Sequence, residues 1–248
     1  MITFNNIHRI GHHIYENETY HHYHYPEMLA RYDSNFLQFK KLPALEEFKE
    51  AYSYLHNFHL RKGQKHVKFY LPENEKPDNP LLNYLKDFKF EIGFQELYKI
   101  QPAEFPKADP PADIKLELIS ENNLRTFLLL HYEQDLEFGI DFADQKIDLN
   151  RTLFNDPAIE MVLAYWKGEP AGSVTLIHAE HTVEIDHLVV EDKFQRRGIG
   201  TQLQAFAMNR NTGKTIILVA DGEDTARDMY RKQNYQFIGF KYEIQKID

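Results

Sequence analysis

An apolar run passes into a glycine-containing turn in the stretch Asp186-His187-Leu188-Val189-Val190-Glu191-Asp192-Lys193-Phe194-Gln195-Arg196-Arg197-Gly198-Ile199-Gly200-Thr201. Glycine lets the backbone adopt unusual dihedral angles and lets a ligand approach the main chain closely. A helix that starts there offers free N–H groups and the positive end of its dipole, which together suit a pyrophosphate. Arginine side chains can add charge-assisted hydrogen bonds to phosphates. Two glycines before a helix also fit a simple strand–helix turn, so the surrounding sequence has to decide.

Strand and helix patterns follow one another regularly after a proline-rich segment. Four of the eleven prolines lie between Pro102 and Pro111, which predicts a linker at 102–112 between domains at 1–101 and 113–248. Periodicity after the linker predicts an α/β domain in the order β-α-α-β-β-β-α-β-α-β. Its strands are expected at 114–118, 159–166, 171–178, 182–190, 215–220 and 237–244, and its helices from Ser120 through His131 and at 144–154, 200–211 and 225–233.

The segment before the linker repeats the second half of this plan. Two pairs of residues align with the same separation, since Gly93 follows Tyr84 by nine residues and Gly239 follows Tyr230 by nine residues. Where the second copy has the glycine turn, the first has Lys41-Leu42-Pro43-Ala44-Leu45-Glu46-Glu47, without a glycine. We therefore expect a smaller N-terminal α/β domain without a phosphate turn, and at most one cofactor site in the chain.

Composition sets broad limits on function. The 248 residues are 42% hydrophobic and 27% charged, as in ordinary globular proteins, and none is cysteine, which excludes disulfides, thiolate metal sites and a cysteine nucleophile. A net charge of −9 argues against a nucleic-acid partner. The sequence contains neither a visible signal peptide nor a membrane-spanning run, so we expect no membrane partner and a cytoplasmic location. The oligomeric state stays open.

The stretch from Asp186 to Gly200 resembles the acyl-CoA signature of the GNAT superfamily of N-acyltransferases, an apolar strand followed by Q/R-x-x-G-x-G/A. Met229-Tyr230-Arg231-Lys232-Gln233-Asn234-Tyr235 is also similar to the segment before the last strand of that family. The resemblance covers roughly residues 112–248. It implies a mixed sheet flanked by helices, preceded here by a degenerate GNAT-like domain, and transfer of an acetyl group from acetyl-CoA to an amine by direct attack in a ternary complex.

The resemblance also assigns roles to particular positions. Tyr230 would be the acid that protonates the leaving thiolate, and Glu184 would be the base, acting directly or through water. Acetyl-CoA would be held by Leu188, Val189, Val190, Gln195, Arg196, Arg197, Gly198, Ile199, Gly200, Thr201, Ala226 and Tyr230.

Each catalytic assignment has a plain structural alternative. Tyr230 could simply pack in the core, as the aligned Tyr84 is expected to do. Strict alternation along the strand places Glu184, Asp186 and Leu188 on one face and His187 on the other. The two acidic residues could then face solvent, and His187 is a weaker candidate for the base because its face is expected to be packed.

The acceptor and the histidines are less well determined. Six carboxylates against one lysine between 133 and 148 favour a cationic amine, such as a polyamine, an aminoglycoside or a lysine side chain, although a solvated acidic face has the same composition. His22 and His24 have a spacing that can bind zinc or nickel, but no carboxylate set completes a site, so we assign no metal. A non-catalytic acyl-CoA sensor or scaffold is the alternative function. A two-domain aminoacyl- or thiol-ligand transferase that uses tRNA is disfavoured by the acidic region.

Overall fold

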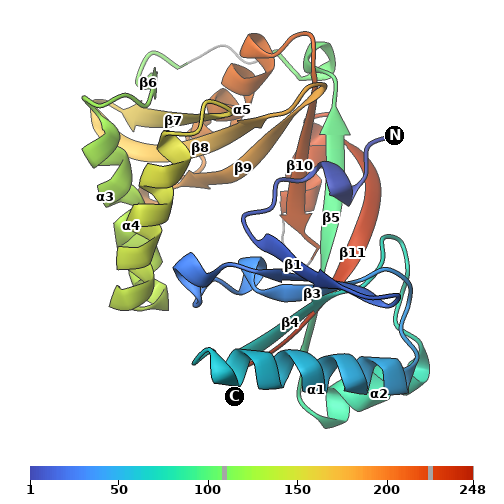
Figure 1. Ribbon diagram of the computed structural model, residues 1–248. Helices are drawn as coiled ribbons and strands as arrows, with labels where there is room; N and C mark the ends of the chain where they lie inside the picture. Colours follow the sequence, from blue (N-terminus) through green and yellow to red (C-terminus); the bar gives the residue numbers. More distant parts are fainter. Residues whose placement is uncertain (108–110, 223–225, 248) are drawn as a thin grey trace. The chain divides into compact units, whose positions relative to one another are not determined.

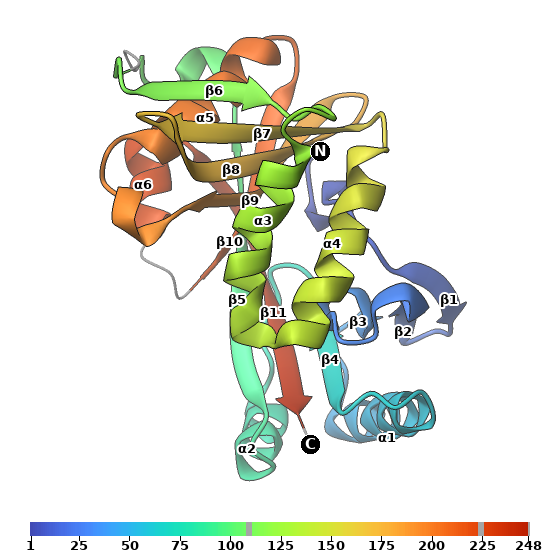
Figure 2. The same cartoon turned by 90° about the vertical axis from the view of Figure 1, so that its left-hand side faces the viewer.

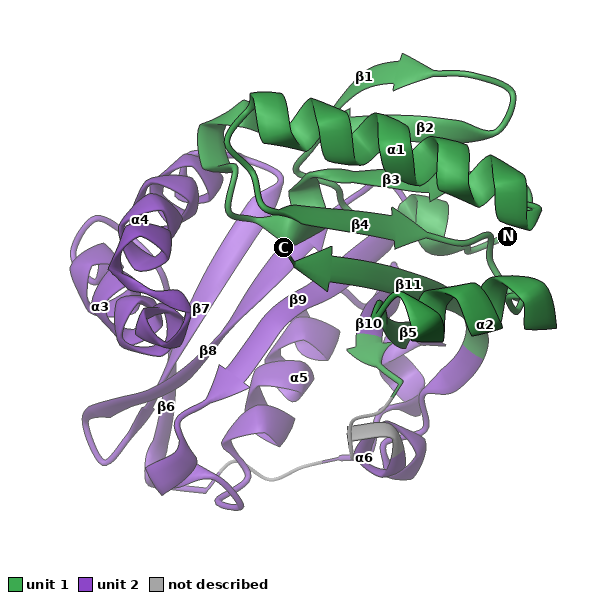
Figure 3. Ribbon diagram, turned by 90° about the horizontal axis from the view of Figure 1, so that it is seen from below, with its two compact units in different colours: residues 1–97, 220–227, 238–248 green, residues 98–219, 228–237 purple. Residues whose placement is uncertain are grey.

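The computed structural model describes residues 1–107, 111–222 and 226–247, and the side chains of all of these except 226 and 227. The chain forms two compact units (Figure 3). Unit 1 comprises residues 1–97, 220–227 and 238–248, and unit 2 comprises residues 98–219 and 228–237. The units are therefore not two consecutive halves of the chain, because the last strand lies mostly in unit 1. None of the described helices has both the length and the apolar character needed to cross a bilayer.

Unit 1 is a sheet with two helices and short 3₁₀ turns. Its strands follow the order β1-β2-β3-β4-β11-β5, in which β3 and β4 are parallel and β4 and β11 are antiparallel. Phe48, Leu55, Phe69, Leu81 and Leu85 are fully buried in its core. The elements are η1 (Phe4–Asn6), β1 (His12–Glu16), β2 (Tyr20–His24), η2 (Pro26–Met28), η3 (Tyr32–Ser34), β3 (Phe36–Phe39), α1 (Leu45–Arg61), β4 (His66–Tyr70), α2 (Asn79–Asp87), β5 (Glu91–Ile100) and β11 (Gln236–Ile247).

Unit 2 is a mixed sheet flanked by helices. Its strands follow the order β10-β9-β8-β7-β6, with β9 and β10 parallel and the other pairs antiparallel. Helices α3 and α4 cover one face of β7 and β8, and α5 covers the opposite face (Figures 1 and 2). The elements are η4 (Pro102–Glu104), β6 (Ile114–Leu118), α3 (Leu124–Asp135), η5 (Leu136–Phe138), α4 (Ile140–Phe154), β7 (Ile159–Trp166), β8 (Glu169–His178), β9 (Thr182–Val190), η6 (Asp192–Phe194), α5 (Ile199–Arg210), β10 (Thr215–Asp221) and α6 (Ala226–Lys232).

The α/β fold class expected from the sequence is confirmed, and most predicted elements agree closely with the structure. The strands at 159–166 and 182–190 have the predicted bounds, and the helix after the glycine turn runs over 199–210 instead of 200–211. The largest differences are in two helices: α3 runs over Leu124–Asp135, with Asn123 and not Ser120 at its N-cap, and α4 begins at Ile140 and not near residue 144, after Gly139 with φ 103°.

The repeat predicted from the sequence corresponds to a repeated order of elements. The series β3-α1-β4-α2-β5 has the same order as β9-α5-β10-α6-β11, and each series begins with a parallel pair of strands. The aligned tyrosines occupy the same place in both, since Tyr84 lies on α2 and Tyr230 on α6. The two copies differ in the residue that precedes the first helix of each series, which is Ala44 before α1 and the left-handed Gly198 before α5.

Candidate functional site

The glycine turn leads directly into α5 through two residues with left-handed backbone. Arg196 has φ 60° and Gly198 has φ 84°, and the helix begins at Ile199. The N–H of Gln202 bonds back to the carbonyl oxygen of Gly198 at 3.0 Å. The N–H groups that precede it in the first turn have no acceptor within the helix, as at any helix start. No acidic residue lies in this turn, so an anion would meet N–H groups and the positive end of the dipole without competition.

The side chains of the turn are exposed and partly held in place. The Arg197 guanidinium lies 5.0 Å from the ring centroid of Trp166 and donates a hydrogen bond to the backbone oxygen of Lys193 at 3.2 Å. Gln195 donates to Asp192 at 2.7 Å, and Arg196 is exposed. The turn therefore presents two cations to solvent at the start of α5.

A β-bulge in β9 decides which of its residues face α5. Thr175 of β8 pairs with Asp186 and Ser173 pairs with Val189, so His187 and Leu188 together oppose the single residue between them. His187 adopts φ 46° at this point. The bulge shifts the alternation by one residue. The prediction that Leu188 shares a face with Glu184 and Asp186 was therefore wrong.

The position of Gly200 shows where the strand's side chains lie after the bulge. A Cβ atom on Gly200 would lie 3.6 Å from Leu188 Cδ2 and 3.7 Å from Val190 Cγ2. Leu188 and Val190 thus pack toward α5. His187 and Val189 line a pocket beside α3, and Val190 at the end of the strand also contributes to its lining. The two sides of β9 consequently have different surroundings, one beside the glycine turn and one beside a polar pocket.

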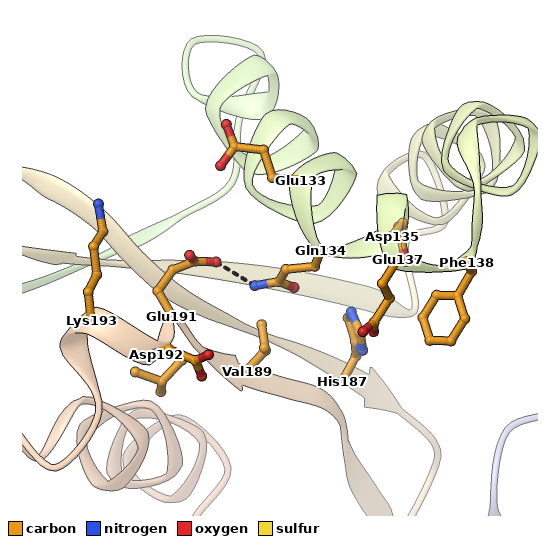
Figure 4. Close-up of a pocket in the computed structure, with 11 residues that line it drawn as sticks. Glu133, Gln134, Asp135, Glu137, Phe138, His187, Val189, Glu191, Asp192 and Lys193 are labelled. Atoms are coloured by element: carbon orange, nitrogen blue, oxygen red, sulfur yellow. Dashed lines mark hydrogen bonds between the residues drawn. The ribbon is translucent and has the colours of Figure 1, made fainter.

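The pocket has a volume of about 660 Å³ and is lined from the end of α3, from η5, and from β9 through η6 (Figure 4). Five carboxylates line it against one lysine, Lys193: Glu133, Asp135, Glu137, Glu191 and Asp192. A smaller pocket of about 260 Å³ shares Glu133, Glu191 and Lys193 with it. Three of the six carboxylates in the acidic region 133–148, which was expected to favour a cationic acceptor, therefore line this pocket: Glu133, Asp135 and Glu137.

Asp135 is the most unusual of these carboxylates. Its side chain is 6% exposed, and its Oδ2 atom has no hydrogen-bond partner within the described part of the chain. Burial raises its pKa, and the nearby Lys146 acts in the opposite direction. A buried carboxylate oxygen without a partner is costly, and a cation or donor from a bound molecule would compensate for it. Glu191, in contrast, already accepts a hydrogen bond from Gln134 at 2.6 Å (Figure 4).

A chain of hydrogen-bonding groups connects the pocket to the interior. His187 Nε2 lies 3.0 Å from His131 Nδ1, and His131 Nε2 lies 2.9 Å from Ser173 Oγ. Burial lowers the pKa of His131 to about 2, with the His187 charge as a second cause, so its ring is neutral at ordinary pH. A neutral imidazole donates a hydrogen bond from one nitrogen and accepts one at the other, so the His131 ring can bond to Ser173 and to His187 at the same time. The sequence pattern marked His131 only as a helix-core position and ranked His187 below Glu184.

The two catalytic residues predicted from the sequence lie outside this pocket. Glu184 is 7% exposed on β9 before the bulge, and it pairs with Ile177 of β8. Tyr230 lies on α6 with its ring 5.5 Å from that of Tyr98 and 5.4 Å from that of Tyr235. Neither is among the residues that line the two pockets described. The side chain of Ala226, a predicted coenzyme contact, lies outside the described residues, although its backbone begins α6.

Each part of the chain matches a known family of domains. Residues 130–248 match the family described as acetyltransferase (GNAT) domain, and residues 2–98 match a domain of unknown function, DUF5613. No curated protein is significantly similar to the sequence.

Solved structures extend the comparison to the whole chain. A functionally unknown conserved protein from Staphylococcus epidermidis is 33% identical, with TM-score 0.91 and coverage of 100% of this chain and 98% of that chain. A GCN5-related N-acetyltransferase from Kribbella flavida is 14% identical, with TM-score 0.63 and coverage of 92% and 86%. A tandem GNAT protein from the clavulanic acid biosynthesis pathway is 9% identical, with TM-score 0.53 and coverage of 86% and 75%. The last two similarities concern the fold alone.

Proposed function

This chain belongs to the GNAT superfamily of acetyltransferases, with a degenerate GNAT-like domain before its GNAT domain, and from that membership we propose that it transfers an acetyl group from acetyl-CoA to a cationic amine. The observation that carries the proposal is the arrangement around β9. One side of the strand's end packs toward the glycine turn at α5, and the other side lines an acidic pocket. A donor site and an acceptor site on the two sides of one strand suit a reaction in a ternary complex.

The donor would be held at the glycine turn. Backbone N–H groups from Arg196 through Thr201 would bind the pyrophosphate, and Arg196 and Arg197 would add charge. The end of β9, from Leu188 to Val190, would bond the pantetheine arm through its backbone. The free first turn of α5, without an acidic residue, supports this assignment.

The acceptor would bind in the acidic pocket as a cation. Asp135 would supply the buried partner for an ammonium group, and the exposed carboxylates around it would raise the local concentration of cations. Attack on a thioester needs the neutral amine, and deprotonating an alkylammonium of pKa about 10 at pH 7 costs roughly 4 kcal/mol. The site therefore needs a proton acceptor within the pocket.

We assign that role to His187; Glu184, the base predicted from the sequence, is not among the residues that line the pocket and is the alternative. The Nε2 atom of His187 faces His131, so Nδ1 would take the amine proton while His131 and Ser173 hold the ring. The acetyl-CoA thioester supplies the acyl carbon, to which the new C–N bond forms as the C–S bond breaks. Tyr230 would give its proton to the departing thiolate, a role that stays a prediction from the family resemblance.

Release of free thiol from acetyl-CoA across a panel of amines tests the proposal. Polyamines and aminoglycosides should react, and neutral or anionic amines of similar size should not. His187→Ala should lower kcat by about 10²–10⁴-fold, as expected for loss of a general base. Asp135→Asn should raise KM for the cationic amine, whereas Asp148→Asn, on an exposed face of α4, should change neither constant.

The second candidate is an acyl-CoA sensor or scaffold. One observation favours it, namely that Glu184 and Tyr230 both lie outside the pocket lining. Tight acetyl-CoA binding with no thiol release on any amine would support the sensor and contradict the enzyme. Binding of no acyl-CoA at all would contradict both.

A further inference from the structure

Three potential metal ligands converge on the hairpin of β1 and β2 in unit 1. His13 and Glu16 lie on β1, and His21 lies on β2. The His21 Nδ1 atom is 3.3 Å from His13 Nε2 and 2.9 Å from Glu16 Oε2, and His13 Nε2 is 3.9 Å from the same carboxylate oxygen. These three atoms form the only such group of three or more among the residues that the structure describes.

The hairpin's register brings the three side chains together. Glu16 pairs with His21 across the strands, and His13 pairs with Tyr23. The register of the two strands shifts between His13 and Tyr15. β1 is the edge strand of its sheet and is exposed along its whole length (Figure 3). A small solute can therefore reach the three ligand atoms from solvent.

The separations between these atoms fit a single bound ion. Zinc binds imidazole nitrogen and carboxylate oxygen at about 2.0–2.2 Å in a tetrahedral arrangement, which places two ligands roughly 3.4 Å apart. The observed separations run from 2.9 to 3.9 Å. Two imidazoles and one carboxylate are also a ligand set of catalytic zinc sites, which leave the fourth position open.

We propose that His13, Glu16 and His21 bind a divalent transition-metal ion of the zinc class, with a water in the open position. Imidazole ligands suit zinc, nickel and copper, whereas magnesium and calcium prefer sites built from oxygen alone. The proposal goes beyond acyl transfer, because the three residues belong to unit 1 and the glycine turn and the acidic pocket belong to unit 2.

Lys40 is the competitor for this site. Its Nζ atom lies 3.1 Å from Glu16 Oε2, where it neutralises the carboxylate. A divalent ion would displace the ammonium group from Glu16, so removal of Lys40 should strengthen binding.

The site differs from the pair of histidines that the sequence spacing suggested. His22 and His24 are buried, with ring centroids 6.4 Å apart. Phe58 contacts both rings, at 4.7 and 5.0 Å. Spacing within one strand identified residues that share a face, whereas the proposed site depends on pairing between two strands.

Calorimetric titration of the untagged full chain with Zn²⁺ tests the proposal. We expect one ion per chain, and His13→Ala or His21→Ala should weaken binding by about tenfold or more, because each removes one metal bond. Glu16→Gln should also weaken it, and Lys40→Met should strengthen it. His12→Ala is the matched control, since this neighbouring exposed histidine pairs with Glu27 instead and should leave the affinity unchanged.

Cobalt substitution provides a second readout. Co²⁺ bound by the wild-type chain should show the visible absorption of a four- or five-coordinate nitrogen and oxygen site, and His13→Ala should lose it. The His13 side chain is 44% exposed, so this variant should keep the native circular dichroism spectrum. Absence of Zn²⁺ binding by the wild type, or equal affinity in wild type and His13→Ala, would overturn the proposal.

Discussion

The starts of α1 and α5 occupy the same place in the two copies of the repeat, but only the start of α1 carries acidic side chains. At α1 the side chain of Glu47 accepts a hydrogen bond from the N–H of Ala44 at 2.9 Å, and Glu46 adds a second carboxylate to the first turn. At α5 a left-handed Gly198 precedes the helix, and no carboxylate lies in the first turn. The first helix start is capped by its own acidic side chain, and the second can receive an external anion.

Under the proposed assignment, a phosphate site of this kind depends on a few residues at one helix end and not on the scaffold. Both copies keep a parallel strand pair joined by a helix. Acidic residues near a helix N-terminus are stabilised by the dipole, and they would repel a second anion. The N-terminal copy therefore has the same arrangement of strands and helices without the glycine turn to which we assign the coenzyme.

Placing a carboxylate in the second helix start should have the largest effect. Gly200→Asp should weaken acetyl-CoA binding by about 100-fold, or about 2.7 kcal/mol, because the new charge would face the pyrophosphate. The fold should survive, since a Cβ at this position meets only ordinary contacts at 3.6 and 3.7 Å. Ala44→Asp at the corresponding helix start is the control. Equal loss of affinity in both variants, measured calorimetrically, would mean that the two helix starts do not differ as described.

The two units should also differ in their response to acid. Burial lowers the pKa of His22 to about 3, of His59 to about 4 and of His66 to about 3, all in unit 1. In the unfolded chain these three histidines bind protons near pH 6.5, whereas in the folded unit they stay neutral to a lower pH. The free energy of unfolding of unit 1 is therefore highest above about pH 6.5 and falls as the pH drops below that value. Each histidine should cost roughly 2 kcal/mol of folding free energy at pH 5.

Hydrogen exchange at pH 7 and pH 5 would check this expectation. Unit 1 should lose protection before unit 2, in which His131 is the corresponding buried imidazole. His66→Phe should reduce the loss of folding free energy of unit 1 between pH 7 and pH 5 by the contribution of one histidine, roughly 2 kcal/mol. If unit 2 opens first, or if His66→Phe leaves the dependence unchanged, burial of neutral histidines is not what limits acid stability.

Charge reversal beside the turn should have a smaller effect. Arg196→Glu should weaken acetyl-CoA binding by about tenfold, or about 1.4 kcal/mol, because an exposed contact to phosphate is lost and a repulsion is added. The loss should diminish at high salt. Lys41→Glu, before α1, is the matched change in the other copy, and we expect no change in affinity. An effect of Arg196→Glu that is independent of salt would argue against a phosphate contact.

The sequence predicted the fold and the place of the glycine turn because both depend on local patterns. Apolar periodicity defined the strands, and glycine spacing marked the start of α5. The pocket was harder to predict because it joins residues 133–138 of one region to 187–193 of another. The acidic residues were noticed as a run, but nothing local indicated that Asp135 would be buried without a partner.

The β-bulge explains the main error about the site. Strict alternation would orient His187 away from Asp186, and one extra residue in β9 reverses that assignment. A positive φ at a histidine is uncommon, and no residue in the local sequence signals it. The hydrogen-bonded chain from Ser173 through His131 to His187 links three elements far apart in the sequence, so only the packed structure reveals it.

The stoichiometry of acetyl-CoA binding to the full chain tests the central claim most directly. Calorimetry on the wild-type chain and on Gly200→Asp would measure it at the same protein concentration. We predict one coenzyme per wild-type chain and a loss of that site in the variant. Two coenzymes per chain, or one that the variant binds as tightly as the wild type, would contradict the claim that the glycine turn before α5 is the single donor site.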